Sequence, residues 1–280
     1  MRLTVNGIDS FVATGGRDFD AALPAVVLIH GGGMDHSVWA LHSRWFAHHG
    51  YAVLAPDLPG HGRSGGTPLT TIADMANWIA ALIAASGVAG AWLIGHSMGS
   101  LVALETASRH PARVSALSLI GTAAPMTVGA ELLKAAEANE HKSVDMVSLW
   151  GLGVTATLGG CLAPGLWMLG GAQRVLEASR PGVLFADLSA CNNYKDGLEA
   201  ASRISVPVTV IIGGHDLMTP LRAGRALAAA LSDARIVVLR DAGHLMMAER
   251  PDDVLAALRG QEIYSLSHWK NRLVRRGRGL

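Results

Sequence analysis

Cysteine and net charge are the two features that this chain has least of. Its 280 residues include only two cysteines, Cys161 and Cys191, which are too few for a disulfide framework. Their scarcity fits a reducing compartment, so we expect a cytoplasmic protein. The formal net charge is +1. Since this charge gives no bulk attraction for a polyanion, the sequence does not predict a nucleic-acid-binding protein.

Charged residues are also scarce, at 16% of the chain, whereas half of the residues are hydrophobic. This balance favours a compact protein with a sheet buried on both faces. Residues 1–7 reach an Asn-Gly turn too early for a signal peptide. The stretch Met146–Gln173 has no charge and could cross a bilayer, but glycines and Pro164 interrupt it. We therefore expect apolar elements that cover a pocket, not stable membrane insertion.

Cofactor motifs are a further absence. No group of histidines, cysteines and carboxylates has the spacing of a zinc site, and no glycine-rich loop has the pattern that holds phosphates. The sequence therefore predicts neither a metal nor a nucleotide cofactor.

Apolar runs alternate with helical patterns over most of the chain. An early hairpin with an Asn-Gly turn is followed by buried strands and amphipathic helices in turn. The expected strands are Leu3–Val5, Ser10–Ala13, Ala25–Ile29, Tyr51–Ala55, Ala91–Ile94, Val114–Ile120, Val206–Ile212 and Arg235–Leu239. The expected helices between them are Ser37–His49, Thr70–Ala85, Leu101–Arg109, Leu221–Leu231 and Pro251–Arg259. This alternation predicts an α/β fold with a mostly parallel, doubly wound sheet.

The alternation fails in the middle of the chain. Residues 122–205 carry helical patterns without a convincing strand and are too long for a loop in a compact domain. We predict helices at Met126–Ala138, Val144–Trp150, Gly165–Ala178 and Val183–Ala201. The predicted organisation is a core of residues 1–121 and 206–262, a helical insertion of residues 122–205, and a basic C-terminal tail of residues 263–280, interpreted as a solvated end.

One strand, Ala91–Ile94, turns abruptly into a helix through Gly95-His96-Ser97-Met98-Gly99. Glycines two positions either side of Ser97 permit a very tight turn, and the turn lifts the serine hydroxyl to the helix N-terminus. This G-x-S-x-G pattern resembles the nucleophile turn of the α/β-hydrolase family. The loop Asp57–Ser64 also resembles that family, as does the turn Gly213–Pro220.

The resemblance covers about residues 24–260 and implies an α/β-hydrolase fold with a helical lid after the sixth strand. It also implies three catalytic groups in the chain order Ser, Asp, His. A serine hydroxyl needs a base to take its proton and an acid to orient that base. His244 follows a late strand in a Gly-His loop, and Asp216 follows the strand before it. Asp241 is a rival acid, but it lies on the same loop as His244.

The oxygen of an attacked ester carbonyl becomes an anion, which two backbone N–H groups should receive. We predict the amide of Met98, directly after the nucleophile, as one donor. The other should come from the glycine-rich loop after Ala25–Ile29, with Gly32 first and Gly33 second. His30 begins that loop, and we expect it to hold the loop in place.

The substrate pocket is less sharply defined by the sequence. His96 stands beside the nucleophile, and the insertion offers Trp150, Trp167 and Met168. Such apolar residues suit a small apolar ester, although they suit the internal packing of the insertion equally well.

The sequence thus predicts a serine hydrolase that cleaves carboxylic esters of small apolar molecules through an acyl-enzyme. The alternatives that share its motifs are a C–C bond hydrolase of ring-cleavage products, a lactonase and a cofactor-free perhydrolase. A third class, a small-molecule receptor that has kept the fold without turnover, is disfavoured by the complete set of catalytic groups. The sequence makes no prediction of an oligomeric state.

Overall fold

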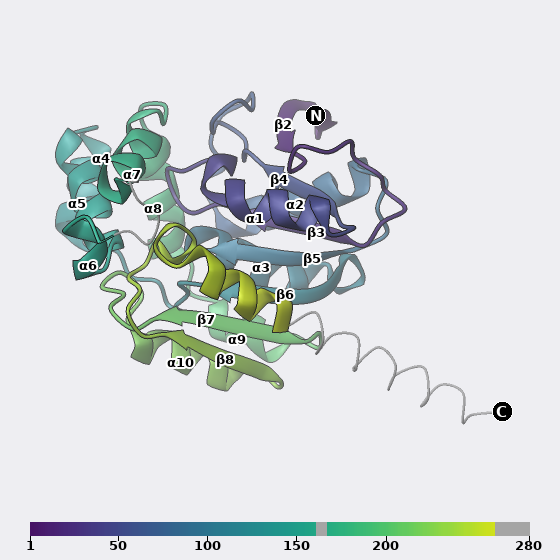
Figure 1. The fold of residues 1–280 in the computed structure, drawn as a ribbon. Coiled ribbons are helices and arrows are strands. Elements are labelled where there is room, and N and C mark those ends of the chain that lie inside the picture. Colours follow the sequence, from purple (N-terminus) through teal and green to yellow (C-terminus); the bar gives the residue numbers. More distant parts are fainter. Residues whose placement is uncertain (161–166, 261–280) are drawn as a thin grey trace.

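The computed structural model describes residues 1–160 and 167–260. The predicted basic tail and Cys161 lie outside these residues. Within them, strands form one eight-stranded sheet in the order β1-β2-β4-β3-β5-β6-β7-β8 (Figure 1). The strands are β1 Arg2–Val5, β2 Ile8–Ala13, β3 Ala25–Ile29, β4 Ala52–Pro56, β5 Ala91–His96, β6 Val114–Ile120, β7 Val208–Gly213 and β8 Ala234–Leu239.

The sheet is parallel from β4 through β8, and only the hairpin β1–β2 at one edge runs antiparallel to its neighbours. Every residue of β3, β4, β5 and β7 is buried, as expected for strands covered on both faces. The structure confirms the predicted mostly parallel α/β sheet. Because parallel strands end at the same edge, the loops after β3, β5, β7 and β8 meet there.

Helices cover both faces of the sheet (Figure 1). One face packs in a single apolar cluster with α2, α3, α9 and α10, and the other with α1 and residues of the C-terminal helical segment. These elements are the short 3-10 helix η1 His36–Trp39, α1 Ala40–His48, α2 Ile72–Ala85, α3 Met98–Arg109, the 3-10 turn η2 Pro111–Arg113, α9 Gly197–Ser202, α10 Leu221–Ala230 and α11 Met246–Glu249. Residues 251–260 are also helical.

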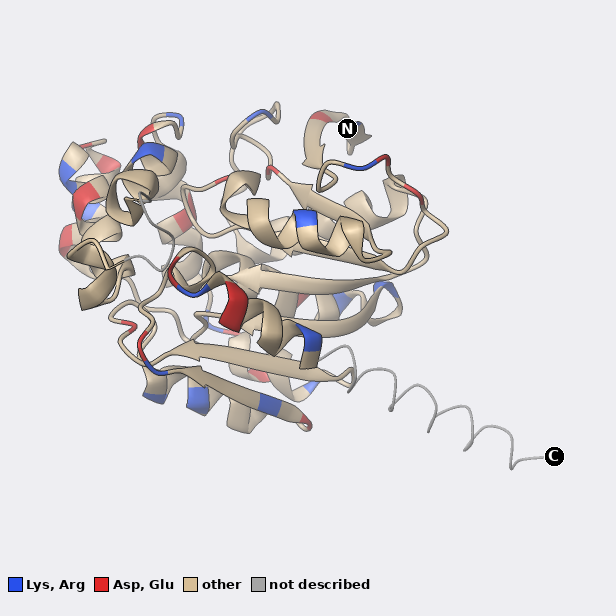
Figure 2. Cartoon of the chain, in the orientation of Figure 1, with Lys and Arg blue, Asp and Glu red and all other residues tan. Residues whose placement is uncertain are grey.

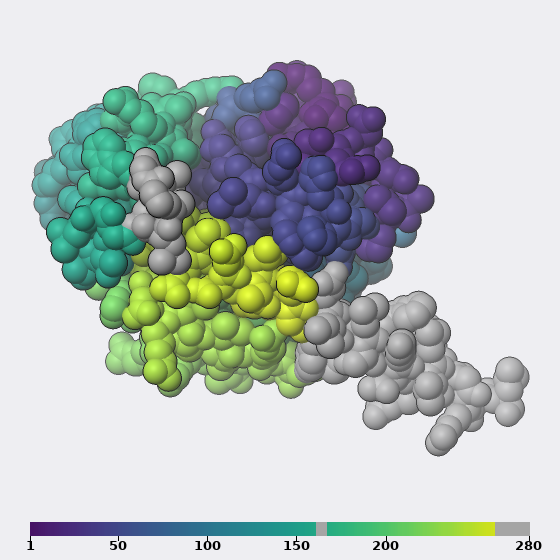
Figure 3. All heavy atoms as spheres, in the orientation of Figure 1, coloured from purple at the N-terminus to yellow at the C-terminus, as the bar shows by residue number. Residues whose placement is uncertain are grey.

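The segment between β6 and β7 contains six helices in its described part. They are α4 Ala130–Glu137, α5 His141–Gly151, α6 Val154–Thr157, α7 Met168–Glu177, α8 Val183–Asn193 and α9. Helices α4 to α7 gather beyond one end of the sheet, and the space-filling view shows them against the N-terminal third of the chain (Figures 1 and 3). They share an apolar cluster of their own, which Met34 and Leu245 connect to the core.

The predicted single helix Val183–Ala201 is instead two helices. Helix α8 ends before Tyr194, whose hydroxyl donates to Oε2 of buried Glu105 on α3 at 2.6 Å. Ala200 and Ala201 are fully buried in the cluster beneath the sheet. The insertion therefore returns to the core through α9 before β7 begins.

Acidic and basic residues lie on elements other than the central strands. Figure 2 shows acidic and basic residues mixed over α4, α5 and α7, whereas the central strands β3 to β7 carry none. The uncharged stretch Met146–Gln173 falls into parts of three short helices in its described part. No described helix is both long enough and apolar enough to span a membrane.

Candidate active site

Ser97 stands on a strained turn between β5 and α3. Its backbone has φ 52° and ψ −119°, outside the regions that side-chain-bearing residues normally occupy. Glycine is required on both sides: a Cβ on Gly95 would lie 2.1 Å from the carbonyl oxygen of Gly99, and one on Gly99 would lie 2.3 Å from that of Ile29. The packing of α3 against β3 and β5 thus fixes the position of the serine.

His244 and Asp216 meet from the loops after β8 and β7. Nδ1 of His244 lies 2.8 Å from Oδ2 of Asp216, and both side chains are almost completely buried. The other oxygen, Oδ1, accepts the backbone N–H groups of Met218 and Thr219 at 2.9 and 2.7 Å. The hydroxyl of Thr219 donates to Oδ2 at 2.6 Å. The sequence did not indicate a role for Thr219, although this residue lies within the turn Gly213–Pro220 that resembles the family.

The charges at this pair favour an ionised acid. Burial alone raises the pKa of the Asp216 carboxyl. His244 and the hydrogen bonds of Thr219 lower the pKa by more than burial raises it, so it lies below its ordinary value. The rival acid Asp241 has a side chain that is 71% exposed and lies 3.8 Å from Arg250. Asp216, not Asp241, is therefore the acid beside His244.

The second nitrogen of His244, Nε2, is buried and has no hydrogen-bond partner among the described residues. His244 lines the same cavity as Ser97. Because Nδ1 faces an ionised carboxylate, the proton of the neutral ring stays on Nδ1, and Nε2 keeps a free lone pair. This is the tautomer that a general base requires.

The amides expected to receive an oxyanion lie on two loops at the same cavity. Gly32 and Met98 both line it. The amide of Gly33, the second choice on the β3 loop, donates instead to Oδ2 of Asp187 at 2.7 Å. This bond favours Gly32 over Gly33 as the donor from that loop.

The cavity has a volume of about 150 Å³ and a mostly apolar lining. His96 and Trp150 line it. Trp167 and Met168, both described, do not: Trp167 is 65% exposed, and Met168 packs inside the apolar cluster of the insertion. An apolar residue that lines a pocket and one that packs a helix look alike in a sequence, so these two were misplaced. The main apolar side chains of the lining are Met34, Met126, Val128, Leu132, Val147, Leu184, Leu188 and Met218.

His96 holds the His244 loop. Its Nε2 donates to the backbone oxygen of His244 at 2.9 Å, and its Nδ1 has no partner in the part of the chain that the structure describes. Burial, reinforced by neighbouring His244, lowers the pKa of His96 to about 3. The ring is therefore neutral and braces the His244 loop from below.

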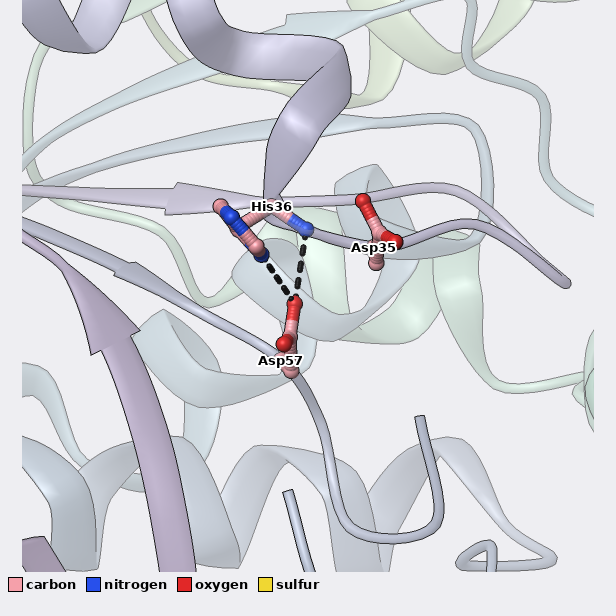
Figure 4. Close-up of side chains that lie close together, drawn as sticks. All are labelled: Asp35, His36 and Asp57. Atoms are coloured by element: carbon pink, nitrogen blue, oxygen red, sulfur yellow. Dashed lines mark hydrogen bonds and ion pairs between the residues drawn. The ribbon is translucent and has the colours of Figure 1, made fainter. Parts of the chain in front are cut away.

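A cluster of Asp35, His36 and Asp57 could hold a metal ion by the spacing of its ligand atoms. Figure 4 shows, however, that His36 already points at Asp57 through both its backbone N–H and Nδ1, at 2.8 and 2.7 Å. The second oxygen of Asp57 accepts the amide of Arg63, and Asp35 caps Ser37. These contacts explain the cluster as a brace of the loops after β3 and β4.

Two buried carboxylates near the site were not found from the sequence. Asp187 of α8 contacts His61 and Gly33. Glu249 of α11 accepts the amides of Gly243, next to His244, and of Gly153 at the start of α6. Burial raises the pKa of Glu249. The sequence placed His61 in a turn motif, but nothing in it indicated which distant residue the ring would meet.

The parallel sheet, the serine on its sharp strand–helix turn and the buried His–Asp pair on the next loops define an α/β hydrolase. The family model described as "Alpha/beta hydrolase family" matches residues 26–258. The chain therefore belongs to the alpha/beta hydrolase family, and it is a hydrolytic enzyme of the esterase type.

Relatives and solved structures give the context. A pimeloyl-(acyl-carrier protein) methyl ester esterase of Chromobacterium violaceum is 34% identical over 245 residues, or 84% of this chain and 92% of the relative. An enol-lactonase from Burkholderia xenovorans superposes with a TM-score of 0.82 and 25% identity, covering 94% of this chain and all of the other. An esterase from Exiguobacterium antarcticum has a TM-score of 0.80 at 17% identity, covers 92% and 97% of the two chains, and thus shares the fold.

Proposed function

We propose that this chain is a serine hydrolase that cleaves carboxylic esters through an acyl-enzyme, with Ser97 as nucleophile, His244 as base and Asp216 as acid. The observation that carries the proposal is the state of His244. Its Nδ1 is held 2.8 Å from Asp216, while its Nε2 is unpartnered at the cavity that Ser97 also lines. A buried imidazole with one nitrogen held and the other free is arranged to accept a proton.

The reaction would run in two halves. Oγ of Ser97 attacks the ester carbonyl carbon while Nε2 of His244 takes the hydroxyl proton, and Asp216 stabilises the imidazolium. The amides of Gly32 and Met98 receive the oxyanion. Collapse of this intermediate breaks the ester bond, and His244 gives its proton to the leaving alcohol. Water, deprotonated by His244, then attacks the acyl carbon, and collapse of this second intermediate releases the acid as His244 returns the proton to Oγ of Ser97.

The cavity supports a small, uncharged substrate. Its described lining contains no Lys, Arg, Asp or Glu, so an ionised group on the substrate would be buried there without a counter-charge. A cavity of about 150 Å³ is the size that takes a benzene ring. We therefore propose short apolar acyl groups on a small alcohol. The methyl ester in the names of the relatives fits the small alcohol of this class, whereas its pimeloyl acyl part, joined to a carrier protein, is larger than the acyl group proposed here.

A lactone is the second candidate, favoured by the enol-lactonase neighbour. A lactone is an internal ester, so the same nucleophile and base would open it, and the leaving alcohol would stay on the acyl group. C–C bond hydrolysis and perhydrolysis on the same groups are alternatives with no supporting observation of their own.

Turnover of a short-chain aryl ester tests the proposal. We expect wild type to release the chromophore with a burst, and Ser97→Ala to lose activity by about 10⁶-fold in kcat, the order seen when a serine nucleophile is removed. Ser202→Ala is the control, because the exposed hydroxyl of Ser202 donates to the backbone oxygen of Glu199 within α9. Normal turnover by Ser97→Ala, at wild-type stability, would rule out the assignment. Lactones and ring-cleavage dienones in the same panel separate the second candidate from the first.

A further inference from the structure

A buried ion pair joins the helical insertion to the loop after β4. Oδ2 of Asp187 on α8 lies 2.8 Å from Nε2 of His61, and the two side chains are 0% and 1% exposed. The other ring nitrogen of His61, Nδ1, lies 3.0 Å from the backbone oxygen of Pro59. Because both nitrogens face acceptors, both carry a proton, and His61 is an imidazolium.

The neighbouring histidine has the opposite state. His30 lies 4.9 Å from His61 between ring centroids. Its Nε2 accepts the amide of Leu58 at 3.2 Å, and its Nδ1 donates to the oxygen of Gly31 at 2.9 Å. Burial, with the charge of His61 beside it, lowers the pKa of His30 to about 4. Only one of the two rings is thus charged, and it is the one against Asp187.

The same carboxylate oxygen also holds the loop after β3. Oδ2 of Asp187 accepts the amide of Gly33 at 2.7 Å. Gly33 has φ 69°, and a Cβ on Gly32 would lie 3.2 Å from Cβ of Asp187. Asp187 therefore holds the peptide between Gly32 and Gly33 in place. The next peptide back along the chain carries the N–H of Gly32, which lines the cavity.

The ion pair gives this contact its strength. A carboxylate that is fully buried needs a compensating cation, and Oδ1 of Asp187 has no hydrogen-bond partner among residues 1–160 and 167–260. The negative charge of the carboxylate is therefore compensated through the two contacts of Oδ2. His61 supplies the positive charge, and the amide of Gly33 supplies a charge-assisted hydrogen bond, which is stronger than a neutral one.

We propose that Asp187, held by His61, is a positioning residue of the reaction: it fixes the loop after β3 so that the amide of Gly32 points at the developing oxyanion. This proposal rests on the proposed function, because an oxyanion forms only if Ser97 attacks a carbonyl. It assigns a task to the insertion beyond covering the pocket. The insertion delivers, from a distant part of the chain, the group that sets the geometry of the oxyanion site.

Replacement of the carboxylate tests the proposal. Asp187→Ala removes the acceptor, and we expect kcat to fall about 100-fold with little change in KM, because the contact matters when the oxyanion forms. The rate of phosphonylation of Ser97 by a fluorophosphonate should fall by a similar factor. Asp187→Asn keeps an acceptor oxygen for Gly33 and should recover part of both rates. The kcat and the labelling rate of His61→Gln should fall in the same direction.

Matched controls lie on the outside of the insertion. Glu131→Ala and His141→Gln each break a contact between exposed side chains, with Lys142 and with Asp145 and Glu177 respectively. Neither touches the loop after β3, so we expect wild-type rates from both. A general loss of stability would change the unfolding midpoint without the selective fall in kcat.

The possible outcomes separate the two proposals. If the fluorophosphonate does not label wild type at all, the proposed function fails. If it labels wild type, and folded Asp187→Ala keeps kcat and the labelling rate within twofold, the positioning role fails alone. Should Asp187→Ala not fold, Asp187→Asn and His61→Gln decide the matter: wild-type kcat in both would overturn the role, and a fall in kcat at unchanged KM would support it.

Discussion

At the scale of single residues, the contact with Asp216 sets the tautomer of the His244 ring. The carboxylate accepts from Nδ1 of the ring, from Thr219 Oγ1 and from two backbone amides, so it has little freedom to move. An amide in its place could donate to Nδ1 and would hold the ring in the other tautomer, with the proton on Nε2. A protonated Nε2 cannot take the proton of Ser97.

We therefore expect Asp216→Asn to lower kcat by about 10⁴-fold at neutral pH, the order seen when the same change is made in a Ser-His-Asp triad. The change is nearly isosteric, so the unfolding midpoint should move much less than after a change of shape. Ester hydrolysis under saturating substrate measures it. A loss smaller than tenfold would show that Asp216 does not orient the base.

At the scale of elements, the insertion is attached to the core at several separate points. Asp187 on α8 reaches the loops after β3 and β4, and Glu249 on α11 bonds the amide of Gly153 at the start of α6. Tyr194, between α8 and α9, donates to Glu105 on α3. These anchors explain why helices without strands between them still have fixed positions against the sheet.

Removal of one anchor that does not line the cavity should affect stability alone. Tyr194→Phe leaves the buried Glu105 carboxylate with one partner fewer, and we expect it to lower the free energy of unfolding by about 1–3 kcal/mol. Since Tyr194 does not line the cavity, kcat/KM should stay within twofold of wild type. Denaturant unfolding and ester hydrolysis on the same preparations measure both. An unchanged unfolding midpoint would contradict the anchor.

The His61–Asp187 pair should make part of the stability depend on pH. Burial lowers the pKa of His61, but the Asp187 carboxylate raises it more, so the pKa lies above its ordinary value of 6.5 in the folded protein. The contribution of the pair is therefore fully present below about pH 6.5 and is lost as pH rises through the folded pKa. Asp187 and Asp57 are the charged groups that raise the pKa of the ring, and the neighbouring ring of His30 lies 4.9 Å away between centroids.

The matching measurement is the free energy of unfolding of wild type and His61→Gln across a pH series. We expect the difference between them to be largest near about pH 6 and to shrink as pH rises above the folded pKa of His61. His141→Gln, whose ring is exposed, serves as the reference. A difference that grows with pH would contradict a charged His61.

At the scale of the whole molecule, the features that could be predicted from the sequence are those that a local residue pattern determines. Continuous apolar runs located the strands, with β3 and β6 matching their predicted bounds, and the glycines around Ser97 marked the turn. Parallel strands end at one edge, so the meeting of Asp216 with His244 followed from the order of elements.

Contacts between distant segments could not be predicted in this way. The packing of the insertion on the core decides that Asp187 accepts the amide of Gly33. It also decides that Trp167 faces solvent while Trp150 lines the cavity. Helical periodicity gives the apolar face of a helix but not its partner. The break between α8 and α9 has the same origin, because it follows from the contact of Tyr194 with α3.

The most direct measurement of the central claim is intact-protein and peptide mass spectrometry after treatment with a fluorophosphonate. We expect a single phosphonyl adduct on the peptide that contains Ser97, absent from Ser97→Ala and slow to form in His244→Ala, where the base is missing. Labelling of wild type at another serine, or none at Ser97 under conditions in which the ester is turned over, would contradict it.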